Sequence, residues 1–278
     1  MTVQGYHPVV SSRVDQHVNN ARDRAELQEL LRRPQYPRSA EYDPEWVLES
    51  MMGPNVLWQT EALCEVLPLE PEMRVLDLAC GKVASSIFLA REFGVTVWAV
   101  DMLVSATSNG KRVEDAGLAD RVFPLRADAR SLPVPKDYFD AIVCVGGYQY
   151  FGTDALYLSE LLKFVRAHGR IGITVPGLTE ELDSPPPDLS PTLRLAFEAL
   201  HSPAWWRRHW EHGQRVGVEV ADLIPDGWRD WADWYDVCVE RGVADPPRIF
   251  QAESEMLRRD AGKRFGLVRA VARVATYD

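Results

Sequence analysis

Apolar runs alternate with amphipathic segments through the middle of the chain. Segments of 10–15 residues separate the apolar runs, which is typical of βαβ units around a parallel sheet. The run at 141–145 is apolar throughout, as expected of a strand that is covered on both faces. The predicted strands are 74–78, 95–100, 121–125, 138–145 and 170–175, and the predicted helices between them are 83–93, 103–116 and 155–167.

Helical patterns flank this core on both sides. Residues 14–33 have the period of an amphipathic helix, which Pro34 ends, and Asp43-Pro44 is a favourable helix start. A proline-rich loop at 183–191 leads away from the core. Further helices are predicted at 55–66, 202–211, 226–240 and 249–261, and further strands at 216–223 and 265–274.

These elements predict an α/β fold with a mostly parallel, seven-stranded sheet and an antiparallel edge strand. Residues 1–44 form an N-terminal helical extension or lid in this interpretation, which could also pair two subunits in a homodimer. Residues 45–278 form one domain, with its core at 73–178 and a substrate cap with the last strands at 179–278.

Charge and composition narrow the function classes. The formal net charge is −10, whereas nucleic-acid binding usually requires a basic surface, so nucleic acid is not the expected partner. No apolar run is long enough to cross a bilayer, and the expected location is the cytoplasm. The four cysteines lie far apart, without the spacing of a zinc site, and no metal is predicted.

The segment 74–83 carries the most specific chemical signal. A strand runs into a turn and then a helix, with Asp77 at the end of the strand, where open α/β sheets bind ligands. Ala79 and Gly81 are small enough for a ligand to approach the backbone. A nicotinamide-type turn needs G-x-G-x-x-G and a P-loop needs G-x-x-x-x-G-K-[ST], and this segment fits neither.

This turn, followed by Asp101 at the end of the second strand, resembles the class I S-adenosylmethionine-dependent methyltransferases. The resemblance covers about residues 45–275 and is greatest to a branch with Leu-Asp-x-x-Cys-Gly-Lys at the first motif. The segments 150–154, 175–178 and 201–211 also resemble that branch, whose members act mostly on small molecules. The resemblance implies a Rossmann-like fold, S-adenosylmethionine as cofactor and S-adenosylhomocysteine as product.

The resemblance also assigns individual residues. Asp77 is expected near the amino-acid end of the cofactor, and Asp101 should accept hydrogen bonds from the ribose hydroxyls. Met102 should pack on the adenine, and Asp128 should receive its amino group. The family's first glycine is Ala79 here, and a frequent third glycine is Val83. The expected cofactor-binding set is Asp77, Ala79, Cys80, Gly81, Asp101, Met102, Asp128, Ala129, Val145 and Gly146.

Aromatic residues near the sheet edge where the cofactor is expected suggest a binding site for the molecule that accepts the methyl group, the acceptor. A positive sulfonium is attracted to aromatic faces, although tryptophans that pack a cap onto the sheet explain the same pattern. The candidate acceptor-binding residues are Tyr148, Tyr150, Phe151, Trp205, Trp206 and Trp228. Tyr148 and His201 are the candidates for a hydrogen-bonding residue or a general base.

Methyl transfer to a small molecule by in-line displacement is the leading hypothesis for the function. The alternative is an enzyme that binds S-adenosylmethionine without methylating, and that cyclises or cleaves it or catalyses a rearrangement. A binding protein without activity is a third possibility. The release of methylthioadenosine without any acceptor would favour the second class. The sequence leaves the acceptor and the methylated atom open.

Overall fold

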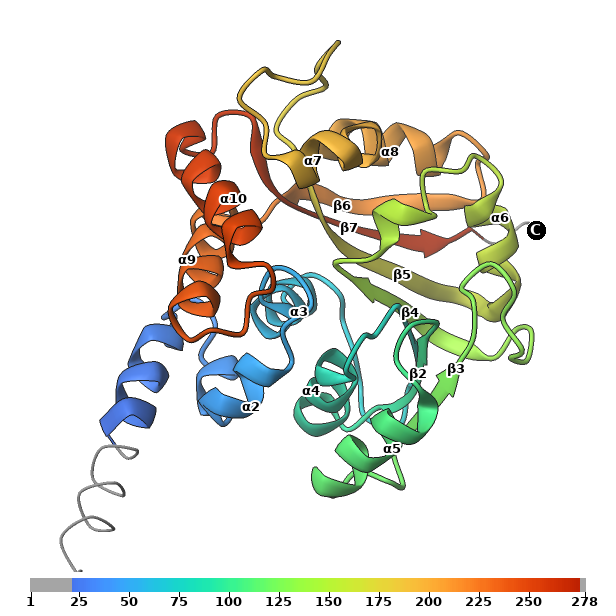
Figure 1. Cartoon of the computed structure of the whole chain (residues 1–278). Helices are drawn as coiled ribbons and strands as arrows, with labels where there is room; N and C mark the ends of the chain where they lie inside the picture. Colours follow the sequence, from blue (N-terminus) through green and yellow to red (C-terminus); the bar gives the residue numbers. More distant parts are fainter. Residues whose placement is uncertain (1–21, 276–278) are drawn as a thin grey trace, which may run out of the picture.

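The computed structural model describes residues 22–275, and its centre is one seven-stranded sheet with the strand order β3-β2-β1-β4-β5-β7-β6. Helices cover both faces of this sheet (Figure 1). The mixed α/β sheet predicted from the sequence is thereby confirmed. The strands are β1 (Arg74–Leu78), β2 (Thr96–Asp101), β3 (Val122–Arg126), β4 (Phe139–Val145), β5 (Val165–Leu178), β6 (Val216–Leu223) and β7 (Phe265–Val274).

Strands β1 to β5 are parallel, and β7 runs antiparallel to both of its neighbours, β5 and β6. The antiparallel strand therefore lies second from the edge, and β6 is outermost. The carboxyl ends of β1, β2 and β4 meet at one edge, since the three strands pair in parallel register. This edge is where an open α/β sheet forms its ligand site.

The helices follow the sequence pattern with two exceptions. The segment predicted as one helix at 155–167 is divided, because β5 already begins at Val165. The proline-rich stretch continues into an unpredicted short helix, which Ser190 caps by accepting the Leu193 N–H. The helices are α2 (Pro44–Glu49), α3 (Val56–Cys64), α4 (Ala84–Phe93), α5 (Ala106–Asp115), α6 (Tyr157–Leu161), α7 (Pro191–Ala196), α8 (Pro203–Glu211), α9 (Gly227–Glu240) and α10 (Pro247–Asp260), with 3-10 turns η1 (Ser39–Glu41), η2 (Tyr148–Tyr150), η3 (Leu162–Phe164) and η4 (Phe197–Ala199).

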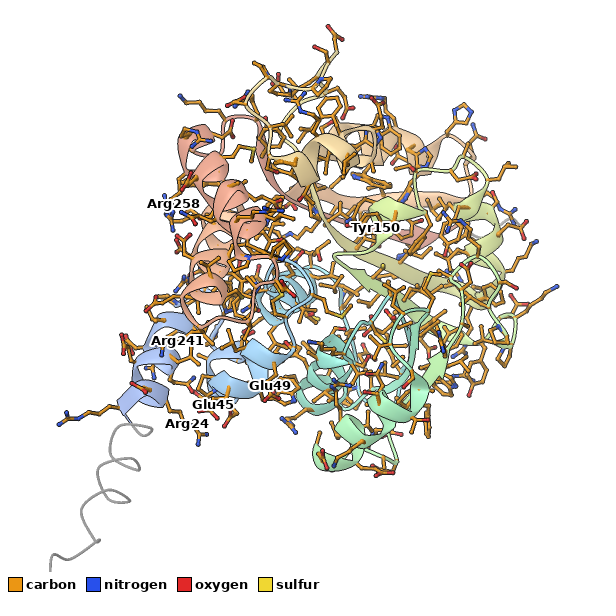
Figure 2. All side chains as sticks on the ribbon, in the orientation of Figure 1. Arg24, Glu45, Glu49, Tyr150, Arg241 and Arg258 are labelled. Carbon is orange, nitrogen blue, oxygen red and sulfur yellow. The ribbon has the colours of Figure 1, made fainter. Side chains whose placement is uncertain are left out.

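Helices α9 and α10 form an antiparallel pair beside the sheet, with the helical residues 22–31 and α2 below them in the view of Figure 1. The rings of Tyr235 and Phe250 meet edge to face, with their centroids 4.9 Å apart. Arg258 of α10 pairs with Asp233 of α9 at 2.8 Å, and Figure 2 places Arg258 on the outer side of the pair. The inner side of the pair is therefore the one that faces the sheet edge.

The N-terminal part of the chain packs on this helix pair. The Tyr36 hydroxyl donates to the buried Asp230 of α9 at 2.9 Å, and Arg33 pairs with Asp233 at 3.0 Å. The helix predicted at 14–33 is present from residue 22 to residue 31, and its first part lies outside the described residues. The predicted division of the chain at residue 44 stays a prediction.

Successive residues along the central strands point to opposite faces of the sheet, so their side chains belong to two separate apolar cores. Val143 of β4 belongs to the core beneath α3, α4, α9 and α10, whereas Cys144 belongs to the core beneath α6 and α8. Among the described residues, no helix is long and apolar enough to cross a membrane.

Candidate active site

The turn after β1 has an unusual backbone. Ala79, Gly81 and Val83 have φ angles of 54°, 54° and 60°, all in the left-handed region that is rare for residues other than glycine. Val83 keeps this conformation while its side chain is completely buried in the core. The position of a frequent family glycine thus retains a glycine-like backbone, and the larger side chain points away from the ligand edge.

Asp101 ties this turn to the loop after β2. One carboxylate oxygen accepts the Gly81 N–H at 2.9 Å, and the other accepts the N–H groups of Leu103 and Val104 at 2.7 and 2.8 Å. The Asn109 amide donates to the Gly81 carbonyl at 2.9 Å. A carboxylate has about four lone-pair sites, so Asp101 retains capacity for a further donor.

Asp77 has a different environment, beneath the turn. Its side chain is fully buried, and the hydroxyls of Ser85 and Ser86 both donate to the same oxygen at 2.6 Å. The second carboxyl oxygen has no partner within the described part of the chain. Burial raises the pKa of Asp77 to about 6, while the two serine hydroxyls oppose this rise. Asp77 thus anchors the start of α4 to β1.

We expect Asp77→Asn to change how stability depends on pH. Because burial raises the pKa of Asp77 from 3.8 to about 6, its contribution to stability is fully present below the unfolded value and is lost as pH rises through the folded one. Between pH 4 and 7 the wild type should lose about 2 kcal/mol of unfolding free energy that the variant keeps. Urea titrations measure this difference; parallel curves for Asp77→Asn and wild type would contradict it.

A cavity of about 470 Å³ opens at the shared edge of the strands. Its first end is formed by the turn after β1, by Asp101 and Leu103 after β2, and by the loop after β4. Gly81 has a φ angle of 54°, which strains any larger residue, and a Cβ atom placed on it would lie 2.7 Å from the Met52 sulfur. The predicted cofactor-binding residues that line the cavity are Ala79, Cys80, Gly81, Asp101, Val145 and Gly146.

The other predicted cofactor-binding residues lie around the cavity. Asp77 is beneath its floor, and Met102 is exposed next to Asp101. Asp128 and Ala129 follow β3, in a loop whose Ala127 N–H donates to the Asp101 carbonyl at 3.2 Å. This loop therefore adjoins the rim of the cavity without lining it.

The second end of the cavity consists of helices that follow β5 in the sequence, together with the segment 50–56. Lys82 holds the start of this segment by donating to the carbonyl of Glu49 at 2.7 Å, and the Trp234 indole donates to the Gly53 carbonyl at 2.8 Å. The lining residues at this end that were not predicted from the sequence are Ser50, Met51, Met52, Gly53, Pro54, Val56, Gln59, Pro176, Thr192, Leu193, Ala196, Leu200, Trp231, Trp234, Tyr235, Ile249, Phe250 and Glu253.

Of the candidate acceptor-binding residues, Tyr150 alone is among the residues that line the cavity. Figure 2 shows Tyr150 at the loop after β4, near the centre of the view. Tyr148 and Trp206 are fully buried against each other on the opposite face of the sheet, with ring centroids 5.6 Å apart. Phe151 packs on Tyr148 in the same core, and Trp228 lies against Gly262.

Helix α8 explains these positions. It packs on β6 and β7 on the face that carries the second core, so its tryptophans cannot reach the cavity on the other face. Trp205 is sandwiched between His201 and His209, with ring centroids 3.5 and 4.4 Å away. His201 also meets the Glu181 carboxylate at 3.0 Å. Neither Tyr148 nor His201, the candidate catalytic residues, lines the cavity.

The aromatic residues at the second end that were not predicted share the spacing of one helix face, and this spacing is visible in the sequence. Trp231, Trp234 and Tyr235 are spaced i, i+3 and i+4, so they share one face of the predicted helix at 226–240. Phe250 and Glu253 have the same three-residue spacing on the next helix. No group of three or more His, Cys, Asp or Glu side chains between residues 22 and 275 is arranged to hold a metal ion.

The sheet order, the turn after β1 and the cavity define a class of protein: an α/β enzyme that binds a nucleoside-type cofactor at the strand edge. Solved structures share this fold. Geranyl diphosphate C-methyltransferase from Streptomyces coelicolor aligns over 91% of this chain and 85% of its own, with a TM-score of 0.64 and 19% identity. The [4+2]-cyclase SpnF aligns over 82% and 84%, with a TM-score of 0.60 and 17% identity. The fold alone therefore does not fix the reaction.

Sequence comparison identifies the family. Residues 75–169 match the model of a methyltransferase domain. Demethylmenaquinone methyltransferase from Beutenbergia cavernae is 33% identical over 184 residues, which are 66% of this chain and 68% of that protein. The chain belongs to the class I S-adenosylmethionine-dependent methyltransferases. It spans 41% and 53% of the lengths of two further methyltransferases that it matches, so the acceptor is not carried over from them.

Proposed function

We propose that the cavity binds S-adenosylmethionine at its first end and a small apolar acceptor at its second end, beside α9 and α10. The observation that carries this proposal is the continuity of the cavity: Gly81 and Asp101 line it together with Trp231 and Phe250. Its volume of about 470 Å³ is within the range of small-molecule sites. A cavity of this size favours a small molecule over a macromolecular acceptor.

The residues at the first end fit the cofactor. In this proposal Asp101, which is 6% exposed, accepts the ribose hydroxyls, because hydrogen bonds to a carboxylate are strong ones. Asp128, exposed on the adjoining loop, receives the adenine amino group, and Met102 packs on the ring. Gly81 and Gly146, both with positive φ, allow the ligand to contact the backbone.

The second end is mainly apolar and aromatic, apart from Glu253, the Gln59 amide and the hydroxyls of Ser50 and Thr192. Trp231, Trp234 and Tyr235 are buried, and with Phe250 they provide flat faces for an aromatic or extended apolar acceptor. The same faces stabilise positive charge, by about 2 kcal/mol when desolvated.

The protein's side chains would promote methyl transfer by positioning the acceptor and by excluding water. The bound cofactor supplies a methyl group on a positively charged sulfur, which a nucleophile can displace. Trp234 fixes the segment 51–54 over the cavity, and Tyr150 lies at its edge. Both groups limit the access of water to the place where the two ends meet.

Methyl transfer is tested by incubating the protein with methyl-labelled S-adenosylmethionine and a panel of hydroxylated and amino-substituted aromatic compounds. We expect label in an extractable product and stoichiometric S-adenosylhomocysteine. Phe250→Ala should raise the KM for the acceptor about tenfold, through the loss of buried apolar contact, and leave the Kd of the cofactor unchanged. Methylthioadenosine formed without acceptor, with no methylated product, would contradict the proposal.

A further inference from the structure

Aromatic side chains of α9 and α10 line the acceptor end of the cavity from two helices. They are Trp231, Trp234, Tyr235 and Phe250. The Tyr235 ring stands edge to face with Phe250 at an interplanar angle of 79°, and with Trp231 at 85°. Rings at such angles present their faces in different directions. Aromatic faces around one space attract a positively charged organic group.

The same end of the cavity contains one acidic side chain, Glu253 of α10. Glu253 lines the cavity although it is only 3% exposed. No lysine, arginine or histidine of residues 22–275 is paired with it. Acidic side chains are rarely buried without a partner, because an unpaired charge is costly to remove from water. The protein therefore leaves the charge of this carboxylate unbalanced.

The polar neighbours of Glu253 supply hydrogen bonds without positive charge. The Ser190 hydroxyl lies 3.4 Å from its Oε2 atom. Burial raises the pKa of Glu253 to about 7, while hydrogen bonds from Ser190, Tyr235 and Trp231 oppose this rise. All three neighbours act as donors, so they favour the ionised carboxylate. What the site still lacks is a cation, and the cavity is the side from which one can enter.

We infer, on the basis of the proposed function, that the acceptor carries a protonated amine, which pairs with Glu253 among the aromatic side chains of α9 and α10. An ammonium group supplies the missing charge and donates charge-assisted hydrogen bonds, whereas a neutral hydroxyl leaves the carboxylate unbalanced. The aromatic faces add to the attraction. Pairing with Glu253 forms and breaks no covalent bond.

This pairing has a consequence for the methylated atom. A protonated amine has no lone pair, so it is not a nucleophile while Glu253 holds it. The methyl group then goes to a different atom of the same molecule, one that reaches the first end of the cavity near Gly146. Glu253 thus determines specificity: it selects an acceptor with an amine at one end and orients the other end towards the cofactor.

The test compares three probes of similar size in the complex with S-adenosylhomocysteine. Tyramine carries an ammonium group, tyrosol a hydroxyl at the same position, and phloretate a carboxylate. At pH 8, above the pKa of Glu253, we expect wild type to bind tyramine about tenfold more tightly than tyrosol. Phloretate should bind most weakly, because it brings a second negative charge to the site. Isothermal titration calorimetry measures all three affinities.

Two variants of α10 locate the effect. Glu253→Gln keeps the size of the side chain and removes its charge, so it should abolish most of the preference for tyramine. Glu255→Gln is the matched control, since Glu255 is exposed on the same helix, and it should keep the wild-type order of affinities.

A third variant provides the test if Glu253→Gln does not fold. Phe250→Leu keeps an apolar side chain and removes an aromatic face. It should lower the ratio of the tyramine and tyrosol affinities about threefold, through the loss of one cation–π contact. An unchanged ratio in this variant would count against the aromatic part of the site.

The outcomes separate the two proposals. Failure of wild type to bind S-adenosylhomocysteine would overturn the proposed function. Normal binding of that product, together with equal affinities for tyramine and tyrosol or with no binding of any probe, would overturn the role of Glu253 alone. A preference for tyramine that persists in Glu253→Gln would do the same.

Discussion

Replacing Asp101 by alanine should lower the affinity for S-adenosylmethionine about 100-fold or more. The substitution removes the acceptor proposed for the ribose hydroxyls, and each hydrogen bond to a buried charge contributes about 1.5–3 kcal/mol. It also releases the N–H of Gly81, which Asp101 holds at 2.9 Å. The turn after β1 would then lose the contact that fixes its position relative to β2. Isothermal titration calorimetry measures the effect.

Asp115→Ala is the matched control for this substitution. Asp115 is an exposed aspartate on α5, and its pair with Lys111 is on the surface. We expect its cofactor affinity to equal that of wild type, and circular dichroism should show both variants folded. Unchanged affinity in Asp101→Ala would contradict the assignment of the first end of the cavity to the ribose.

Trp206→Ala should cost about 3–5 kcal/mol of unfolding free energy, because it removes a fully buried tryptophan from a packed core. The Trp206 ring meets Tyr148 and Trp210 with centroids 5.6 and 6.3 Å away, so a cavity remains between side chains that cannot close it. Urea denaturation measures this loss. The Kd of the cofactor should stay within about twofold of wild type under conditions in which the variant is folded, since Trp206 lies on the other face of the sheet.

The neighbouring Trp205 provides the comparison. It is half-buried and stacked on two histidines, so Trp205→Ala should lose clearly less stability than Trp206→Ala. If Trp206→Ala were as stable as wild type but had a raised KM for the acceptor, Trp206 would belong to the acceptor site after all.

The core of the fold could be predicted because its local signals agree with the tertiary structure. The apolar run at 141–145 and the Asp43 and Asn55 caps correspond to β4 and to the starts of α2 and α3. The early start of β5 at Val165 was not predictable from local pattern. Residues 165–169 contain Arg166, His168 and Gly169 and have no continuous apolar run, and they join the strand through pairing with β4 that begins at Phe139.

The first end of the site followed from the sequence, whereas the second end did not. Gly81 and Asp101 belong to one short motif and the strand beside it, so their spacing predicts their proximity. Trp206 and Trp231 are equally tryptophans on helices after residue 200, but they belong to opposite faces of the sheet. The choice between those faces depends on how α8, α9 and α10 return to the sheet, which local periodicity does not encode. Glu253 was missed because a single carboxylate on an apolar helix face is visible only when the cavity is known.

A crystal structure of the protein with bound S-adenosylhomocysteine is the most direct measurement. We expect the ribose at the Asp101 carboxylate, the cofactor in contact with Gly81 and Gly146, its sulfur towards α9 and α10, and the remaining space bounded by Trp231, Phe250 and Glu253. A ligand bound elsewhere, or one whose sulfur faces away from α9 and α10, would contradict it.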